Sequence, residues 1–402
     1  MLPVTCLVSA DPGILAPLPN LEPLGPVSPS HVIGLQACAL REVWAANRIR
    51  PLLPTSPAAR LGTVAHSLLE KAGRGRFTQT RPGAIERRWD ALLDAAEDTA
   101  TRSWLDRHLV PFATAIPDFE VRRLQAITTA RSLTAEASAV ENTPLSPHQP
   151  PIGCEMAVVT PDERAAGRID VVCASDDGPI LKDYKSGAIY DRANSRRAVK
   201  PEYAVQLKLY AAIYAAMTGT WPSRLEVVPI SGPPEPVSFT REECEYLLDE
   251  AVQLRDRINT LISAGGTLAS QIDRLATPSP PVCRYCAYRP QCPPYVKARA
   301  RDRGAVWPLD VRGHLVEQRK LGNGRLLLVL DSEGTTVHIR GVDPSAERHP
   351  ALTRMTVGDP LAGFNLRPEG NPASFVEGSF TVFYRVLSPE ESDASDSETG
   401  AV

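Results

Sequence analysis

The sequence predicts a mixed α/β fold, and three observations lead to that prediction. In the first third of the chain, apolar residues recur at helical spacing. From residue 154 onward, runs rich in β-branched residues replace this period, and a helical segment separates the third run from a fourth. Beyond Gly304, apolar and polar residues alternate, which is typical of half-buried strands. With 402 residues, the chain is long enough for about two or three domains.

The first part of the chain is expected to be helical after an irregular start. Residues 1–29 contain seven prolines and show neither a helical nor a strand period, so we expect a disordered arm there. A short helix is expected over 30–48, and a second from Leu61 to Lys71, where apolar residues form one stripe. Two longer helices are expected over 84–109 and 118–140.

Strands are expected after a proline-rich linker at 142–151. The segments 154–160, 167–175 and 179–186 are rich in β-branched residues. An Asp-Asp-Gly turn signal stands between the last two, which predicts that they pair as a hairpin.

A helix is then expected from Glu202 to Met217, followed by a strand over 224–231. Thr240 and Glu243 form a capping box, which predicts the start of a helix over 241–263. The order of elements is therefore helix, three strands, helix and strand, with extra helices inserted early.

The chain is expected to end in a separate small domain and a tail. Alternating stretches within 304–388 predict a small β-barrel. An OB-like barrel that binds a single strand and a domain that docks a partner are equally compatible with these residues. Residues 389–402 are acidic and rich in serine, which predicts a disordered tail.

The net charge of −3 hides an uneven distribution. The arm at 1–29 carries −2 and the tail at 389–402 carries −5, so residues 30–388 carry +4. Residues 283–325 alone carry +7, and a second basic run, DRANSRRAVK, occupies 191–200. A charge run is usually only a solvated face, but we expect these two to contact phosphates because they flank the candidate catalytic residues.

The expected compartment follows from what the sequence lacks. No stretch comes near the roughly 18 continuous apolar residues that a membrane helix requires. The N-terminus has no positively charged start and is interrupted by prolines, unlike a secretory signal. We therefore expect the reducing cytoplasm, where the eight cysteines are metal ligands or buried thiols rather than disulfides.

A first group of candidate catalytic residues lies on the expected hairpin. Asp183 and Lys185 are two apart on one strand and so project from the same face, and Asp170 lies on the partner strand. Two carboxylates would bind a hard divalent cation, and the lysine would hold a water or a phosphate charge. Lysine is rare here, with seven against 37 arginines, so its presence at 185 fits a role that needs a compact ammonium. An exposed salt-bridge face remains the alternative on these residues alone.

A second group is the C-x2-C-x5-C motif of Cys283, Cys286 and Cys292. This spacing indicates a metal site, and three thiolates require a fourth ligand, for which Cys38 is the natural candidate. Zinc, an iron–sulfur cluster and three unrelated thiols all remain open, because a thiolate count does not distinguish them. The other cysteines are expected to be spare, and they are Cys6, Cys154, Cys173 and Cys244.

Two further signals are weak when taken alone. Gln206 and Tyr210 are four residues apart on the helix after the strands, so they share one face, but a tyrosine in such a helix is usually part of the core. His66 lies on an amphipathic helix, where a single histidine is more often structural than a ligand.

Taken in order along the chain, these motifs resemble a known family. GTxxH, G-x-x-D, DYKSG, QxxxY and the cysteine motif are similar to those of the RecB-like branch of the PD-(D/E)xK nucleases. More narrowly, they resemble the iron–sulfur members that include AddB-type and CRISPR-associated exonucleases. The resemblance runs from about Ser30 to Tyr295. It implies a nuclease domain over 30–300 with a restriction-endonuclease-like core, a mixed sheet flanked by helices, a helical insertion and an iron–sulfur staple.

The resemblance also implies a role for each matching residue. The ligands of Mg²⁺ or Mn²⁺ would be His66, Asp170, Asp183 and the backbone carbonyl of Tyr184. The other residues of the active site would be the catalytic Lys185, the additional acid Glu155, and Gln206 and Tyr210, which support the site or contact DNA. The ligands of a [4Fe–4S] cluster would be Cys38, Cys283, Cys286 and Cys292. Cys38 departs from the family pattern, because Ala39 follows it where many relatives have proline.

The implied reaction is phosphodiester hydrolysis by in-line attack of a metal-activated water. We expect a metal-dependent DNA exonuclease that acts on single-stranded ends in DNA repair, recombination or phage defence. No Walker A motif occurs in the sequence, so a separate helicase or ATPase is an expected partner. Two other classes stay open: a catalytically silent module that binds DNA or a protein, and a zinc-stapled structural protein.

Overall fold

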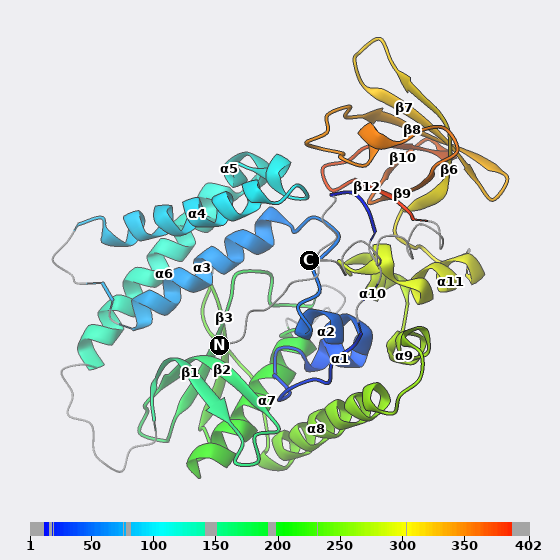
Figure 1. Ribbon diagram of the computed structural model, residues 1–402. Coiled ribbons are helices and arrows are strands. Elements are labelled where there is room, and N and C mark those ends of the chain that lie inside the picture. Colours follow the sequence, from blue (N-terminus) through cyan, green and yellow to red (C-terminus); the bar gives the residue numbers. More distant parts are fainter. Residues whose placement is uncertain are drawn as a thin grey trace, which may run out of the picture.

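The computed structural model describes residues 12–15, 18, 20–74, 76–77, 82–140, 151–191, 198–230, 232–302 and 304–387. Its strands form two sheets, one of five strands and one of seven, and most helices surround the first sheet (Figure 1). Within these residues, no helix is both long and apolar enough to cross a membrane. The expected tail at 389–402 and Cys6 lie outside the described residues.

The first sheet is mixed, as the sequence predicts. Its strands, in spatial as well as chain order, are β1 (Gly153–Val159), β2 (Ala166–Cys173), β3 (Ile180–Lys185), β4 (Arg224–Pro229) and β5 (Glu235–Pro236). The predicted hairpin of β2 and β3 is confirmed as an antiparallel pair, and β3 and β4 run parallel. Helix α7 (Pro201–Thr218) makes the crossover that a parallel pair requires.

Apolar side chains on both faces hold this sheet between helices. The covering helices are α3 (Pro57–Gly73), α4 (Ala84–Arg102), α6 (Phe119–Val140) and α8 (Arg241–Ser263), together with α7. Ile169 and Leu181 share a core with α7 and α8, whereas Val171 and Tyr184 share a core with α3, α4 and α6. Figure 1 shows these two groups of helices on opposite sides of the sheet. A mixed sheet covered on both faces fits the expected restriction-endonuclease-like core.

The single helix predicted over 30–48 is wrong. The structure has two helices there, α1 (Val32–Ala37) and α2 (Ala39–Ala46). Cys38 separates them with an extended backbone, φ −162° and ψ 101°, and its N–H closes α1 on the Gly34 carbonyl at 2.9 Å. The break turns the chain so that both short helices contribute to one core. Helical periodicity did not reveal it, because each half carries the period by itself.

Other helices differ from prediction mainly at their ends. The helix expected over 84–109 ends at Arg102, where Ser103 is extended, and a 3-10 turn, η1 (Arg107–Leu109), follows. Several short helices were not predicted from the sequence, and some of them begin at proline because its fixed φ suits the first turn. These are α5 (Phe112–Ala115), α9 (Leu268–Leu275), α10 (Pro280–Arg284), η2 (Arg289–Gln291) and α11 (Pro293–Arg301).

Part of the expected disordered arm is ordered, which corrects that prediction for residues 20–29. The Val27 N–H donates to the Arg164 carbonyl at 2.9 Å, just before the start of β2. Leu24 exchanges two hydrogen bonds with the side chain of Asn259 on α8, at 2.7 and 2.9 Å. Prolines prevent a regular helix here, but the remaining amides of an extended segment still pair with the body of the protein.

The second sheet has the order β10-β11-β8-β7-β6-β9-β12. Its strands are β6 (Val311–Lys320), β7 (Leu326–Ser332), β8 (Thr335–Val342), β9 (Pro360–Phe364), β10 (Arg367–Glu369), β11 (Asn371–Val376) and β12 (Val382–Arg385). The sheet curls, but β10 and β12 remain at its two edges, so the predicted barrel is not confirmed in the described residues. At the β12 edge, Ile14 pairs in parallel with Arg385, so a chain segment covers this edge in place of closure.

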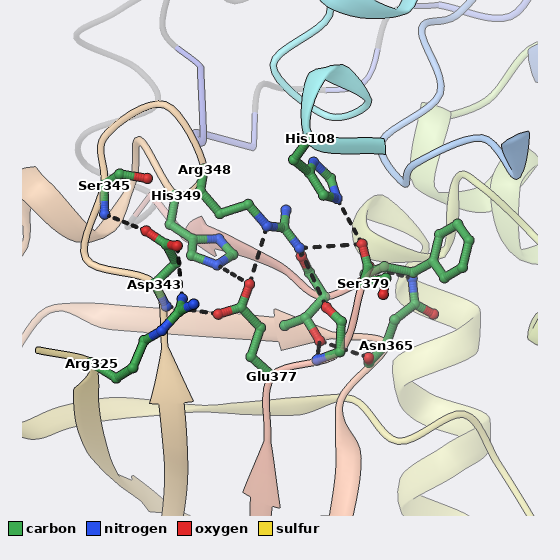
Figure 2. A network of polar contacts seen from close by, with 12 residues as sticks. His108, Arg325, Asp343, Ser345, Arg348, His349, Asn365, Glu377 and Ser379 are labelled. Atoms are coloured by element: carbon green, nitrogen blue, oxygen red, sulfur yellow. Dashed lines mark hydrogen bonds and ion pairs between the residues drawn. The ribbon is translucent and has the colours of Figure 1, made fainter. Parts of the chain in front are cut away.

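A buried polar network joins the second sheet to the helical layer (Figure 2). Arg348, which is 7% exposed, donates to Glu377 Oε1 at 3.1 Å and to the Thr381 carbonyl at 2.6 Å. His108 of η1 lies with its Nε2 atom 2.7 Å from the Ser379 carbonyl. Since a carbonyl only accepts hydrogen bonds, this nitrogen carries the proton. The network therefore holds the 377–381 loop against η1.

We predict that Arg348→Leu lowers the free energy of unfolding by about 3–5 kcal/mol, because Glu377 would lose its cation while remaining largely buried. The neighbouring His349 does not replace that cation, since burial lowers the pKa of its ring. Urea denaturation measures the change. Arg340→Leu is the control: Arg340 is exposed and lies 4.0 Å from Glu369, so its loss should cost less than about 0.5 kcal/mol. Equal effects of the two substitutions would contradict the role given to the network.

Candidate active site

The expected catalytic residues meet where β3 faces helix α7. Asp183, which is 2% exposed, lies on β3 with its Oδ2 atom 2.7 Å from Nζ of Lys185. The two side chains project from the same face, as their spacing predicts. A charge pair that is withdrawn from water requires further polar partners, because neither charge is fully compensated by the other.

Gln206 supplies such partners to both members of the pair. Its Oε1 atom accepts from Nζ of Lys185 at 3.1 Å, and its Nε2 atom donates to Oδ1 of Asp183 at 3.0 Å. Tyr210, one turn further along α7, hydrogen-bonds to Gln206, and burial raises the pKa of its phenol to about 12. The weak Gln206–Tyr210 signal of the sequence therefore corresponds to a real contact between this helix and the charge pair.

Two glycines allow the motif segments to approach one another. A Cβ on Gly62 of α3 would lie 2.7 Å from Oγ of Ser186, which follows β3. A Cβ on Gly167 of β2 would lie 2.8 Å from Cε1 of Tyr210. A side chain at either position would push its neighbour away. The glycines of the GTxxH and G-x-x-D motifs thus keep α3 and α7 close to the strands.

Asp170 on β2 is the second carboxylate of the site. Its Oδ2 atom accepts from the Tyr184 N–H at 2.7 Å. Burial, together with the negative charge of Asp183, raises the pKa of Asp170 to about 7. Burial also raises the pKa of Asp183, while Lys185 opposes that rise. Two neighbouring carboxylates that are shielded from water repel one another, and a cation placed between them would relieve the repulsion.

His66 of α3 lies near the same charges. Burial lowers the pKa of His66, and the Lys185 ammonium lowers it further, while Asp183 acts in the opposite direction. The imidazole is therefore neutral near neutral pH, which is the form in which histidine binds a metal ion.

Glu155 occupies an unusual position in β1. Its backbone has φ +51°, a left-handed conformation that costs on the order of 1–3 kcal/mol for a residue with a side chain. Burial raises the pKa of Glu155, and Glu70 raises it further, while Arg168, at 3.7 Å, lowers it. Glu155 in turn adds to the negative charge around Asp170. Its place beside the site agrees with the expectation of an additional acid, and its role stays a prediction.

Two residues of the site were missed in the sequence. Glu70 lies on α3 four residues after His66, and this spacing, which puts both on one helix face, was the available signal. Tyr203 lies on α7 three residues before Gln206, with its ring centroid 4.8 Å from Nζ of Lys185.

The donor set fits Mg²⁺ or Mn²⁺ in its chemistry. In the described part of the chain, no three His, Cys, Asp or Glu side chains converge closely enough to hold a metal ion. Mg²⁺ is usually held by one or two carboxylates, with waters and substrate phosphates as its other ligands. Asp170 and Asp183 supply two carboxylates, and Oδ2 of Asp183 is buried without accepting a hydrogen bond, although Lys185 is close. Ligation by His66 and by the Tyr184 carbonyl stays a prediction.

The expected cysteine ligands gather in another part of the same core. Cys283 lies on α10, Cys286 and Cys292 flank η2, and Cys38 separates α1 from α2. Cys38 raises the pKa of each of the other three thiols, so it lies near all of them. Burial raises the pKa of Cys283 to about 11, so this thiol stays protonated unless a metal displaces the proton. No disulfide joins the cysteines that the structure describes.

The segment from Cys283 to Cys292, called the cysteine loop below, is connected to the second sheet by a buried ion pair. Arg289, between Cys286 and Cys292, is 2% exposed and donates to the two carboxylate oxygens of Asp310 at 2.7 and 3.1 Å. The hydroxyl of Tyr295 donates to the same carboxylate at 2.7 Å. Because Asp310 directly precedes β6, the ion pair connects this loop to the second sheet.

A comparison with known protein families agrees with this geometry. A family model described as PD-(D/E)XK nuclease superfamily matches residues 26–293, about two thirds of the chain. Among curated proteins, none matches the chain. The matched segment contains the mixed sheet, the Asp183–Lys185 pair and the cysteine motif. Members of this superfamily are typically metal-dependent nucleases, which is the chemistry that two neighbouring carboxylates and a lysine support. The chain belongs to the PD-(D/E)XK nuclease superfamily.

Proposed function

We propose that the protein is a metal-dependent DNA exonuclease of the RecB-like branch, which hydrolyses phosphodiester bonds at single-stranded ends. One observation carries the proposal: Lys185 is held by Asp183 and Gln206 beside a second, partly buried carboxylate, Asp170. The stability of the fold does not require this group of charged residues, because a protein with apolar residues of similar volume in their place is often at least as stable. The preference for single-stranded ends rests on the resemblance of the motif order to AddB-type and CRISPR-associated exonucleases.

In this proposal, the residues around β3 divide the work of hydrolysis. Asp170 and Asp183 bind the cation from two neighbouring strands. When bound, Mg²⁺ or Mn²⁺ would polarise the scissile phosphate and lower the pKa of a water. Lys185 donates a hydrogen bond to that water or to a phosphoryl oxygen, and Gln206 holds the ammonium in position.

Four further residues support the proposed site. His66 and the carbonyl of Tyr184 are additional ligands of the cation, Glu155 adds negative charge near Asp170, and Tyr210 holds Gln206.

We also propose that Cys38, Cys283, Cys286 and Cys292 bind a [4Fe–4S] cluster. Each thiolate of such a cluster binds its own iron atom, whereas the ligands of a zinc ion converge on one point. Cys38 acts electrostatically on each of the other three thiols, which supports four ligands of one centre. The resemblance of the motif order to iron–sulfur exonucleases favours a cluster over zinc.

We propose that the enzyme acts in the cytoplasm in DNA repair, recombination or phage defence. A separate helicase or ATPase would open duplex substrates, because the sequence contains no Walker A motif. A reducing compartment also suits four cysteines that serve as metal ligands.

We predict that the protein degrades a labelled single-stranded oligonucleotide with Mn²⁺ and that EDTA stops the reaction. Asp183→Ala should slow degradation at least about a hundredfold, since the site loses a carboxylate that holds the cation. Asp177→Ala, which removes an exposed carboxylate from the β2–β3 turn, is the control and should keep the wild-type rate. An Asp183→Ala enzyme as fast as wild type would overturn the catalytic assignment. No degradation by wild type would favour a binding module instead.

Removal of the Gln206 amide should impair the reaction without removing a metal ligand. We expect Gln206→Leu to lower kcat by about tenfold or more, because Nζ of Lys185 and Oδ1 of Asp183 each lose a hydrogen bond. Single-turnover kinetics at saturating Mn²⁺ measures this effect. Gln253→Leu changes an exposed position on α8 and should leave kcat unaltered. Equal rates for both variants would show that Gln206 does not position the lysine.

Anaerobic purification tests the cluster. We expect brown protein with visible absorbance and bound iron. The Cys283→Ser variant should contain less iron and absorb less visible light, because one iron atom loses its thiolate ligand. Cys244→Ala, which alters a buried cysteine of α8, should retain the iron of wild type. Colourless wild-type protein containing stoichiometric zinc would refute the cluster in favour of a zinc site.

A further inference from the structure

One aromatic ring beside the proposed active site contacts two lysines. Nζ of Lys185 lies 4.8 Å from the centroid of the Tyr203 ring, and Nζ of Lys200 lies 5.4 Å from the same centroid. Tyr203 is half-buried and lies on α7 three residues before Gln206. The ring therefore links the proposed catalytic lysine to a second ammonium group, one that the proposed mechanism does not use.

The backbone of Lys200 is held firmly in this position. Its N–H donates to the Ile189 carbonyl at 2.8 Å, and an antiparallel bridge pairs Val199 with Tyr190. The hydroxyl of Tyr190 is in turn hydrogen-bonded to Glu235 of β5. Lys200 thus stands at the start of α7, tied to the segment that leaves the carboxyl end of β3.

The two ammonium groups on the ring differ in their ion pairing. Lys185 is paired with Asp183. Two carboxylates act on the Tyr203 phenol, Asp183 and the half-buried Glu202, and Lys200 forms an ion pair with neither among the described residues. The ammonium of Lys200 is therefore available to another anion, and a cation held on an aromatic face still attracts one.

We propose that Lys200 and Tyr203 form a phosphate subsite, which binds the phosphate next to the scissile one in a single-stranded substrate. This inference rests on the proposed nuclease function. Lys200 supplies the charge that neutralises the phosphate, and the Tyr203 ring contacts both ammonium groups. Their separation is no greater than the sum of their distances to the shared centroid, which lets Lys185 and Lys200 contact neighbouring phosphate groups of one strand.

The salt dependence of binding tests the subsite without relying on catalysis. A fluorescent oligothymidylate is titrated with the full-length protein in EDTA, where no cleavage occurs, over a series of NaCl concentrations. Each phosphate contact to a single strand contributes about −0.7 to the slope of log K against log salt. We expect Lys200→Gln to reduce the magnitude of that slope by about 0.7 and to weaken binding about tenfold at low salt.

Two controls separate the subsite from a general loss of charge or of fold. Lys208→Gln removes a lysine of the same helix that is already paired with Glu243 at 2.6 Å, and it should keep the wild-type slope. Tyr203→Phe retains the ring and should bind as wild type, whereas Tyr203→Leu should weaken binding by about two- to fivefold. Thermal melts confirm that each variant is folded.

The outcomes distinguish this inference from the function on which it rests. If wild type binds and degrades the strand, but Lys200→Gln has the wild-type slope, the subsite is wrong and the nuclease proposal stands. If Lys200→Gln and Lys208→Gln lowered the magnitude of the salt-dependence slope equally, the subsite would also be wrong. Lys208, which is paired with Glu243, would then contribute as much to DNA binding as Lys200 does. If wild type neither binds nor degrades single-stranded DNA, both proposals fail.

Discussion

The pair of Asp183 and Lys185 is the constraint around which the mixed sheet and its helices are arranged. Both charges lie on one face of β3, where Asp183 is almost fully buried and Lys185 is only 17% exposed, so further polar partners must come from another element. The parallel pairing of β3 with β4 requires a crossover, and α7 provides it. That helix carries Gln206 to the pair. The same connection thus satisfies the sheet topology and the buried charges.

The second sheet depends on two buried charge networks of the same kind. Arg289 joins the cysteine loop to Asp310 at the start of β6, and Arg348 joins the 377–381 loop to Glu377. Each arginine is almost fully buried, so breaking either pair would leave a carboxylate without its cation. Two such anchors place the curled sheet against both the cysteine loop and η1.

Several local features could be predicted from the sequence because neighbours in the chain decide them. The hairpin of β2 and β3 follows from two β-branched runs and a turn signal. The common face of Asp183 and Lys185 follows from the two-residue period of a strand. The start of α8 follows from its capping box, where the Thr240 side chain accepts from the Glu243 N–H at 3.1 Å. In each case the decisive contacts span only a few residues.

Other features depend on partners that the local pattern does not contain. The extended backbone of Cys38, the ordered contacts of residues 20–29 and the covering of the β12 edge by Ile14 all depend on segments distant in the chain. Glu70 and Tyr203 join the candidate site only because α3 and α7 pack beside the same strands.

The sequence by itself determined the residue types of the candidate site, the strand that carries Asp183 and Lys185, and the order of the motifs. Only the tertiary structure decided that Gln206 bridges the charge pair and that Lys200 and Lys185 contact the same Tyr203 ring. It also decided that β10 and β12 do not pair to close the second sheet into a barrel. The physical reason is that periodicity and turn chemistry act over a few residues. Burial, charge pairing and sheet closure depend on which distant surfaces come into contact.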